Sequence, residues 1–317
     1  MIELGEMRIS LDRRERDASA DFISHAHSDH IAAAKRSESV YASTQTAQLI
    51  ECAYGISIIQ SQIPGNVQLV EAGHMLGSRQ LYIDDAISGT RVVYTGDFQM
   101  ERLRTSEPIR IMEADCVILD STFHHPAFSF GSRAAEEERM INWIGKTTEK
   151  GIVLFSAYRM GKAQELISLL NGHGIIPVVS RKIARINALY EANGVPLDYI
   201  VANGSFGEGA GIDGIGGNFV GISEESGLRE KASALSEALG RKVYTAVATG
   251  FAKVVNFRTD NQFVLSDHAD FNQAIDYIEM TGARKVYTYG QNKELFARNL
   301  VKGGYDASAL PEPKKFE

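Results

Sequence analysis

The sequence predicts an α/β protein, because short β-type runs alternate with helical patterns over the whole length of its 317 residues. Residues 1–125 contain mainly strand and turn patterns, which predicts two strand-rich sheets with few helices. From about residue 126 to residue 250, strand-then-helix units follow one another, a pattern typical of a parallel, doubly wound sheet. A chain of this length usually divides into two domains and has a large enough core to fold without disulfides or structural metals.

The first part is predicted to be a series of short strands with only short helical stretches between them. Each predicted strand is an apolar or alternating run between turn residues. The helix is expected at Ala42–Gly55. The strands are expected at Met7–Leu11, Asp21–Ser24, Val67–Glu71, Gln80–Ile83, Arg91–Tyr94 and Cys116–Asp120.

The rest of the chain is predicted to alternate between helices and strands. Helices are expected at Ala134–Lys150, Gly161–Leu170, Lys182–Ala192 and Phe271–Thr281, and strands at Ile152–Phe155, Ile175–Val179, Gln262–Leu265 and Lys285–Tyr289. The glycine-dense stretch Asn203–Asn218 contains little that could pack, so it reads either as a flap over a site or as a solvent loop. The chain is expected to end in a polar tail, Pro311–Glu317.

The composition describes a soluble globular protein with 44% hydrophobic residues and a net charge of -7, from 33 basic and 40 acidic side chains. That balance argues against a surface that is basic all round but permits a local basic groove. No apolar run approaches the roughly 20 residues of a membrane span, so neither a membrane helix nor a signal peptide is expected. Two cysteines, Cys52 and Cys116, cannot form a disulfide framework in a chain of this length, which favours a reducing, cytoplasmic location.

The strongest chemical signal is the segment from Ser24 to His30, directly after a β-type run. His25, His27, Asp29 and His30 lie within six residues of one another. Imidazole and carboxylate groups are suitable ligands for zinc and similar divalent ions, and donors grouped in this way at one strand end can serve two ions. This segment therefore predicts a metal site.

Further candidates follow other predicted strands. His74 comes after Gly73, and the small residues around it would let the backbone turn tightly beside an inward-facing imidazole. Asp97 and Asp120 each end an apolar run, and Asp267 with His268 ends another. Each has an ordinary alternative: a loop histidine, a turn aspartate, or for Asp267 the N-cap of the next helix.

Taken together, these motifs resemble the metallo-β-lactamase superfamily and, within it, the β-CASP nucleases. The segment Tyr158–Leu166 also resembles the strand-to-helix segment of the inserted domain in prokaryotic members likened to messenger-RNA 3′-end processing factors and ligase-associated exonucleases. The motifs that carry the resemblance are His25-x-His27-x-Asp29-His30, Ala72-Gly73-His74-Met75-Leu76-Gly77-Ser78, Thr95-Gly96-Asp97-Phe98, Asp120-Ser121-Thr122 and Ser266-Asp267-His268-Ala269-Asp270.

The resemblance implies an αββα metallo-β-lactamase sandwich interrupted by an α/β β-CASP domain, with a cleft between them. Mapped onto this sequence, residues 1–125 and 256–317 would form the metallo-β-lactamase domain and residues 126–255 the β-CASP domain. The change of pattern near Pro126 agrees with the first of these boundaries.

The resemblance also implies a role for each motif residue. A first zinc ion would be bound by His25, His27 and His74, a second by Asp29 and His30, and Asp97 would bridge the two. Asp29 would also accept the proton of the attacking water, Asp120 would orient a ligand histidine, and His268 would contact the scissile phosphate.

One departure from the family pattern concerns the second zinc ion. RNA-cleaving members end the strand after His268 with Val-His-Gly and an acid, whereas this chain has Thr288-Tyr289-Gly290-Gln291. Because tyrosine is a poor zinc ligand unless its phenol is deprotonated, the second site is expected to be weak, empty or completed by water. The remaining histidines, His124, His125 and His173, are predicted to be loop or turn residues.

The leading hypothesis is a metal-dependent nuclease that hydrolyses single-stranded RNA or DNA, with RNA 3′-end processing as the model. Arg159 and Lys162, beside the helix start at Gly161, could bind backbone phosphate, although ordinary solvated charge explains them equally well. Two alternatives are a nucleic-acid-binding protein with a degraded second metal site and a small-molecule metallo-hydrolase on the same fold. The expected partner is single-stranded RNA or DNA. No membrane association is expected, and a homodimer is left open.

Overall fold

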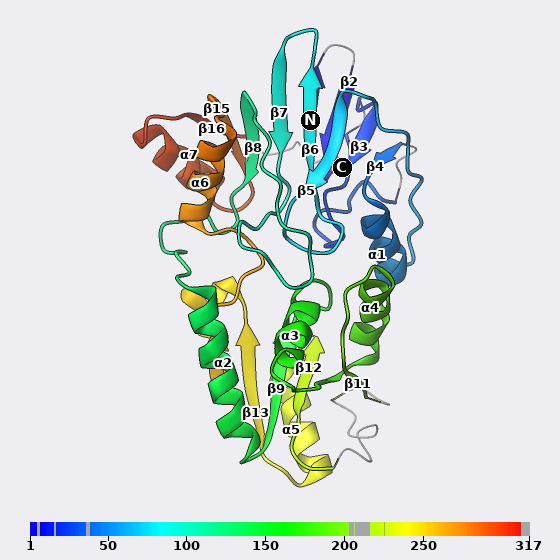
Figure 1. Ribbon diagram of the computed structural model, residues 1–317, viewed down its shortest axis with the longest axis vertical. Coiled ribbons are helices and arrows are strands. Elements are labelled where there is room, and N and C mark those ends of the chain that lie inside the picture. Colours follow the sequence, from blue (N-terminus) through cyan, green and yellow to red (C-terminus); the bar gives the residue numbers. More distant parts are fainter. Residues whose placement is uncertain are drawn as a thin grey trace. The chain divides into compact units, whose positions relative to one another are not determined.

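The computed structural model describes residues 1–4, 7–15, 17–35, 39–202, 206, 216–224 and 226–311 (Figure 1). Most of the glycine-dense stretch, residues 203–205 and 207–215, and the tail from residue 312 lie outside these ranges. The chain forms two compact units: unit 1 contains residues 1–102, 106–129 and 268–317, and unit 2 contains residues 103–105 and 130–267. The predicted α/β class is confirmed.

Unit 1 contains two sheets. In the first, the strand order is β1-β2-β3-β4, with β1 and β2 antiparallel and the other pairs parallel. In the second, the order is β16-β15-β8-β7-β6-β5, and β6 is antiparallel to both of its neighbours. The strands are β1 (Ile2–Leu4), β2 (Met7–Leu11), β3 (Ala20–Phe22), β4 (Val40–Tyr41), β5 (Val67–Glu71), β6 (Arg79–Asp85), β7 (Thr90–Tyr94), β8 (Cys116–Asp120), β15 (Lys285–Tyr289) and β16 (Asp306–Ala309).

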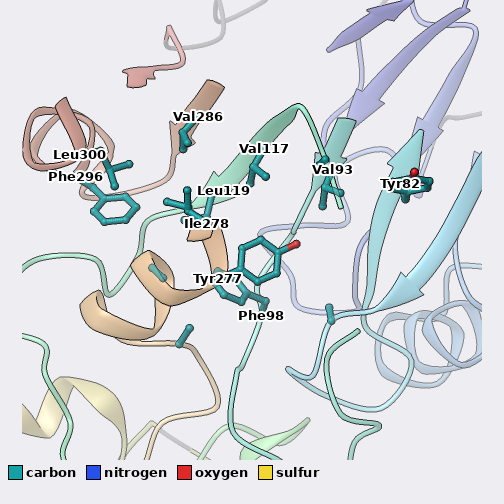
Figure 2. Close-up of a cluster of buried hydrophobic side chains, with 14 of the residues drawn as sticks. Tyr82, Val93, Phe98, Val117, Leu119, Tyr277, Ile278, Val286, Phe296 and Leu300 are labelled. Atoms are coloured by element: carbon teal, nitrogen blue, oxygen red, sulfur yellow. The ribbon is translucent and has the colours of Figure 1, made fainter. Parts of the chain in front are cut away.

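The second sheet of unit 1 buries both of its faces, and alternation along its strands assigns each side chain to one of them. On one face, Leu81 of β6 and Tyr94 of β7 pack with Phe22 of the first sheet, so this core lies between the two sheets. On the other face, Tyr82 and Val93 join a core that includes residues of helices α6 (Phe271–Thr281) and α7 (Lys293–Lys302) (Figure 2). The layers are therefore sheet, sheet and helix.

Helices α1 (Thr44–Tyr54) and α6 of unit 1 have well-defined ends. The N-cap of α6 is Asp270, whose carboxylate accepts hydrogen bonds from the Asn272 and Gln273 amides, and not Asp267, the alternative considered from the sequence. Gly282, at φ 69°, terminates α6 in the left-handed conformation that glycine adopts without steric cost. None of the helices in the described ranges is long and apolar enough to cross a membrane.

Unit 2 is a parallel six-stranded sheet with helices, as the strand-then-helix pattern predicts. The strand order is β11-β10-β12-β9-β13-β14, and every described pairing is parallel. Its strands are β9 (Ile152–Ala157), β10 (Val178–Val179), β11 (Ile200–Val201), β12 (Val220–Glu224), β13 (Val243–Ala248) and β14 (Asn261–Phe263). Its helices are α2 (Arg133–Thr148), α3 (Lys162–Asn171), α4 (Arg181–Ala192), α5 (Leu228–Leu239) and the 3-10 helix η1 (Gly250–Lys253).

The boundaries between the two units differ from the expected ones. Because β14 pairs with β13, residues 256–267 complete the sheet of unit 2 rather than returning to unit 1. The boundary expected at residue 255 therefore moves to residue 267, immediately before His268. The earlier boundary moves from residue 125 to residue 129.

Candidate metal centre

The candidate ligands of unit 1 are brought together by the topology of its two sheets. His25, His27 and His30 lie in the loop after β3, and His74 lies in the loop after β5. Asp97 follows β7, and Asp120 is the last residue of β8. Since β5, β7 and β8 run in the same direction, their carboxyl ends meet at one edge of the second sheet.

Two glycines permit the tight turns that this arrangement needs. Gly73, before His74, and Gly96, before Asp97, have φ values of 80° and 56°. A Cβ atom at position 96 would lie 2.5 Å from Cβ of Ser24, and one at position 73 would lie 2.4 Å from the Gln99 carbonyl oxygen. Both positions therefore require glycine for conformation and for space.

Four donor atoms converge at the centre of the site. Nε2 of His25 lies 3.1 Å from Nδ1 of His27, which lies 3.2 Å from Nε2 of His74. Oδ2 of Asp97 lies 3.6 Å from the His25 nitrogen and 3.9 Å from that of His74. A tetrahedral ion with metal–nitrogen distances near 2.0–2.1 Å would need donors about 3.3 Å apart, so these separations suit a cation.

Burial and protonation also favour a cation at this point. His25, His74 and Asp97 are buried, and Oδ1 of Asp97 has no hydrogen-bond partner among the described residues. Burial, followed by the neighbouring imidazoles, lowers the pKa of His25 well below its ordinary value, so its ring is neutral and keeps a free lone pair. Burial raises the pKa of Asp97 well above its ordinary value when no cation compensates its charge. The four side chains form a possible His/Asp site for a divalent metal.

A second set of donors adjoins the first. Nε2 of His30 lies 3.5 Å from Oδ2 of Asp97 and 3.6 Å from Oδ2 of Asp29, whose side chain is 77% exposed. Burial lowers the pKa of His30, but the carboxylates of Asp97 and Asp12 outweigh it and raise the value to about 10. His30 therefore lies within 3.6 Å of both carboxylates, Asp29 and Asp97, with which the resemblance groups it.

Asp12 is a functional candidate that was not predicted from the sequence. It follows β2 with a φ of 55°, is buried, and lies 2.8 Å from Nδ1 of His30. Its carboxylate also accepts hydrogen bonds from the Ser24 amide, the Ser24 hydroxyl and the Tyr94 hydroxyl, at 2.6–2.7 Å. Asp12 therefore orients both His30 and the start of the histidine loop; its position at the end of Met7–Leu11 was the available signal.

Asp120 and His268 also lie close to Asp97. Nδ1 of His268 is 3.8 Å from Oδ2 of Asp97, and its ring lies 4.5 Å from that of His74 between centroids. Asp97, Asp120 and His268 offer three atoms within 4.8 Å of one another. The Asp120 carboxylate accepts hydrogen bonds from the Thr122 amide and hydroxyl, and Asp12 contacts the ring of the candidate ligand His30.

Tyr289 ends β15, where the RNA-cleaving pattern has a histidine. Its hydroxyl is buried and its ring lies 5.1 Å from that of Tyr94 between centroids. Burial raises the pKa of Tyr289 well above its ordinary value, and the phenol of Tyr94 and the neighbouring carboxylates act in the same direction. A neutral phenol is a poor metal ligand, which supports the expectation of a weak second site.

The histidines outside the site differ from one another. His124 lies in the loop after β8, as predicted, but it is a core residue: its ring packs against Phe98 and Phe296, and burial lowers its pKa to about 3. The Nδ1 atom of His125 accepts a hydrogen bond from the Ala127 amide, as befits a loop residue. His173 is exposed in the turn after α3, as expected.

The two predicted phosphate-binding residues belong to unit 2. Arg159 is partly buried in the loop before α3, which begins after Gly161 without a side-chain cap. Lys162 is only 2% exposed, and its Nζ donates to the Leu265 carbonyl at 2.8 Å and contacts Asp267 at 3.2 Å. The expectation that Lys162 contacts phosphate does not agree with this burial.

Comparison with known proteins supports the family resemblance. No protein-family model matches the chain. A probable DNA ligase of Opitutus terrae is 28% identical over 315 residues, which cover 93% of this chain and 29% of that protein. An RNase J-like protein of Methanocaldococcus jannaschii is 28% identical over 190 residues, 50% of this chain and 45% of that protein. The chain thus spans less than half the length of these relatives.

Similarity to a solved structure concerns the fold alone. The crystal structure of a protein of unknown function from Enterococcus faecalis superposes with a TM-score of 0.59 at 12% sequence identity, covering 94% of this chain and 81% of that one. The ligand motifs occur in family order at the strand ends of unit 1, and the parallel-sheet unit interrupts unit 1 in the sequence. In the order of its motifs and in its similarity to a probable DNA ligase and an RNase J-like protein, the chain resembles the β-CASP nucleases of the metallo-β-lactamase superfamily.

Proposed function

We propose that the chain acts as a metal-dependent nuclease that hydrolyses phosphodiester bonds of single-stranded RNA or DNA. The observation that carries this proposal is the convergence of ligand atoms of His25, His27, His74 and Asp97 within 4.8 Å of one another, three of them on buried side chains. Similarity to proteins named as an RNase J-like protein and a DNA ligase supports nucleic acid as the substrate.

The four donors suit zinc, the metal that we propose for this site. When bound, zinc would supply a nucleophile at neutral pH and positive charge for the phosphate. The side chains of His25 and His74 are completely buried, and Asp97 beside them is nearly so. Their packing therefore excludes water and fixes the ligand geometry in the absence of a cation. No serine or cysteine nucleophile is needed.

Two side chains of the protein, Asp29 and His268, would transfer protons during hydrolysis. Asp29 is exposed and close to His30, so its carboxylate can accept a proton from the attacking water and pass it to solvent. His268 keeps 16% of its side chain exposed beside the buried Asp97. A protonated His268 ring, stabilised by that carboxylate, can donate a hydrogen bond to the phosphate or a proton to the leaving oxygen.

The decisive experiment is hydrolysis of end-labelled single-stranded RNA and DNA, with a chelator and with His27→Ala. We expect each treatment to reduce the rate by about 10³-fold or more, since the variant removes the donor that contacts both other imidazoles. His173→Ala, in an exposed turn, is the matched control and should retain full activity. Hydrolysis that survives both chelator and His27→Ala would contradict the proposal.

The same assay addresses the finer assignments. Labels at the 5′ and 3′ ends separate exonuclease from endonuclease action, and the two substrates separate RNA from DNA. We propose a cytoplasmic role in processing single-stranded nucleic acid, similar to RNA 3′-end processing, following the family members that the inserted domain resembles. Activity on a lactone or thioester, with none on oligonucleotides, would instead support the small-molecule hydrolase.

A second candidate function is nucleic-acid binding with weak or no hydrolysis, and Tyr289 is the observation that favours it. Tyr289→His should raise the bound metal from about one ion per chain to about two, because an imidazole replaces a buried neutral phenol. Elemental analysis after dialysis against zinc would measure this, with Tyr287→His on the same strand as the control. Unchanged stoichiometry would count against the account of Tyr289.

A further inference from the structure

Three residues lead directly into His268, and the backbone carbonyls of two of them accept hydrogen bonds from cationic side chains. Leu265, Ser266 and Asp267 follow strand β14 and complete unit 2, while His268 is the next residue of the chain. Nζ of Lys162 donates to the Leu265 carbonyl at 2.8 Å, and Nη1 of Arg133 donates to the Ser266 carbonyl at 2.8 Å. Two consecutive carbonyl groups are therefore bound by two different side chains, from α3 and α2.

The cations are held in turn by acids of unit 2. Lys162 contacts the Asp267 carboxylate at 3.2 Å, and both side chains are less than one tenth exposed. Nη2 of Arg133 lies 2.7 Å from Oε1 of Glu165, which is 1% exposed, and its Nε lies 3.0 Å from Glu137. We refer to Lys162, Arg133, Glu137, Glu165 and Asp267 as the ion cluster.

The ion cluster also binds the short segment that contains Arg104 and Thr105. The Glu165 carboxylate accepts hydrogen bonds from the Arg104 amide at 2.9 Å and from the Thr105 hydroxyl at 3.1 Å. Burying so many charges costs several kcal/mol per ion unless the geometry is good, and apolar residues of the same volume would often be equally stable. Such a cluster is better explained by the orientation that it imposes than by stability.

We propose that Lys162 and Arg133 are positioning residues that fix the main chain at residues 265–267 and so aim the His268 ring. This inference rests on the proposed function, in which His268 acts on the phosphate. In unit 1 the histidine is held by independent bonds: Gln99 Nε2 donates to the His268 carbonyl at 2.9 Å, and the Ala269 amide donates to the Phe98 carbonyl at 2.7 Å. The bonds from Lys162 and Arg133 supply the restraint from the preceding residues.

A kinetic test separates positioning from phosphate binding. Lys162→Met should lower kcat about 10- to 100-fold with little change in KM, because His268 is misplaced while substrate contacts remain. A lysine that bound phosphate directly would instead raise KM and leave kcat nearly unchanged. Lys182→Met, on the exposed start of α4, is the matched control and should change neither.

A double-mutant cycle tests the route of the effect. If Lys162 acts through His268, Lys162→Met should cause no further loss of kcat in a His268→Ala background. Losses that multiply in the double variant would overturn the proposal, since they would mean that Lys162 works independently of the histidine.

A measurement that does not depend on catalysis tests this inference separately from the proposed function. Hydrogen exchange of the peptide spanning residues 262–270 should accelerate about tenfold or more in Lys162→Met and stay at the wild-type rate in Lys182→Met. Unchanged exchange would overturn the inference even in an active nuclease. If the wild type hydrolyses no nucleic acid, the proposed function fails, while the exchange result still decides whether Lys162 restrains the main chain at residues 265–267.

A double variant that removes both charges of the Lys162–Asp267 pair is the control for a folding defect. Lys162→Met leaves Asp267 buried without its cation, which should lower the melting temperature, whereas Lys162→Met with Asp267→Asn removes both charges and should recover most of that loss. Because the Leu265 carbonyl still lacks its donor, kcat should stay low and exchange fast in the double variant. Recovery of kcat together with stability would show that Lys162 is merely structural.

Discussion

Asp97→Asn is expected to have the largest effect of any single substitution in the protein, reducing both bound metal and hydrolysis by about 10³-fold or more. Its Oδ2 atom lies within 4 Å of ring nitrogens of His25, His30, His74 and His268. The amide keeps the shape of the side chain but removes the negative charge that offsets a cation in this buried site.

Two measurements check this expectation: zinc content by elemental analysis and hydrolysis of a labelled oligonucleotide by the purified variant. Asp84→Asn, on the exposed side of β6, is the matched control and should match the wild type in both. An Asp97→Asn protein that keeps a full complement of zinc and most of its activity would refute the role given to this carboxylate.

Asp12→Ala should lower the free energy of unfolding by about 3–5 kcal/mol. The substitution leaves the Ser24 amide, the Tyr94 hydroxyl and the His30 ring without their shared buried acceptor. It also places alanine at a φ of 55°, which aspartate and asparagine tolerate better.

Urea unfolding of three variants separates these contributions. Asp12→Asn keeps the residue's tolerance of positive φ but loses the charge, so it should fall between the wild type and Asp12→Ala. Asp17→Ala, at an exposed position of the same loop, should change stability by less than about 0.5 kcal/mol. Equal stabilities for Asp12→Ala and Asp17→Ala would rule out a structural role for the Asp12 carboxylate.

Much of the fold could be predicted because the patterns that define its elements are local. The strands Met7–Leu11, Val67–Glu71 and Cys116–Asp120 and the helix Phe271–Thr281 are observed with the predicted bounds. Strands β12 and β13 and helix α5 were not predicted. Both strands mix apolar with small polar residues and lie inside a parallel sheet, where burial on both faces removes the alternation that marks a strand.

In the candidate site, too, the residues with a local sequence signal were predicted, and a residue defined by distant contacts was not. The order of the motifs predicted that His25, His27, His74 and Asp97 would share one sheet edge, because ligand type and strand ends are readable in the chain. Asp12 escaped notice because one aspartate after a strand has no distinctive spacing. Its importance comes from Tyr94, 82 residues away, and from the His30 ring.

From the sequence alone followed the α/β class, the two-part organisation, the family resemblance and the set of candidate metal-binding side chains. Only the tertiary structure placed His124 in a core, made Asp12 the partner of His30 and buried Lys162 against Leu265 and Asp267. The physical reason is that burial and hydrogen-bond partners depend on segments distant in the chain. A histidine or lysine has the same local pattern whether it faces solvent, metal or core.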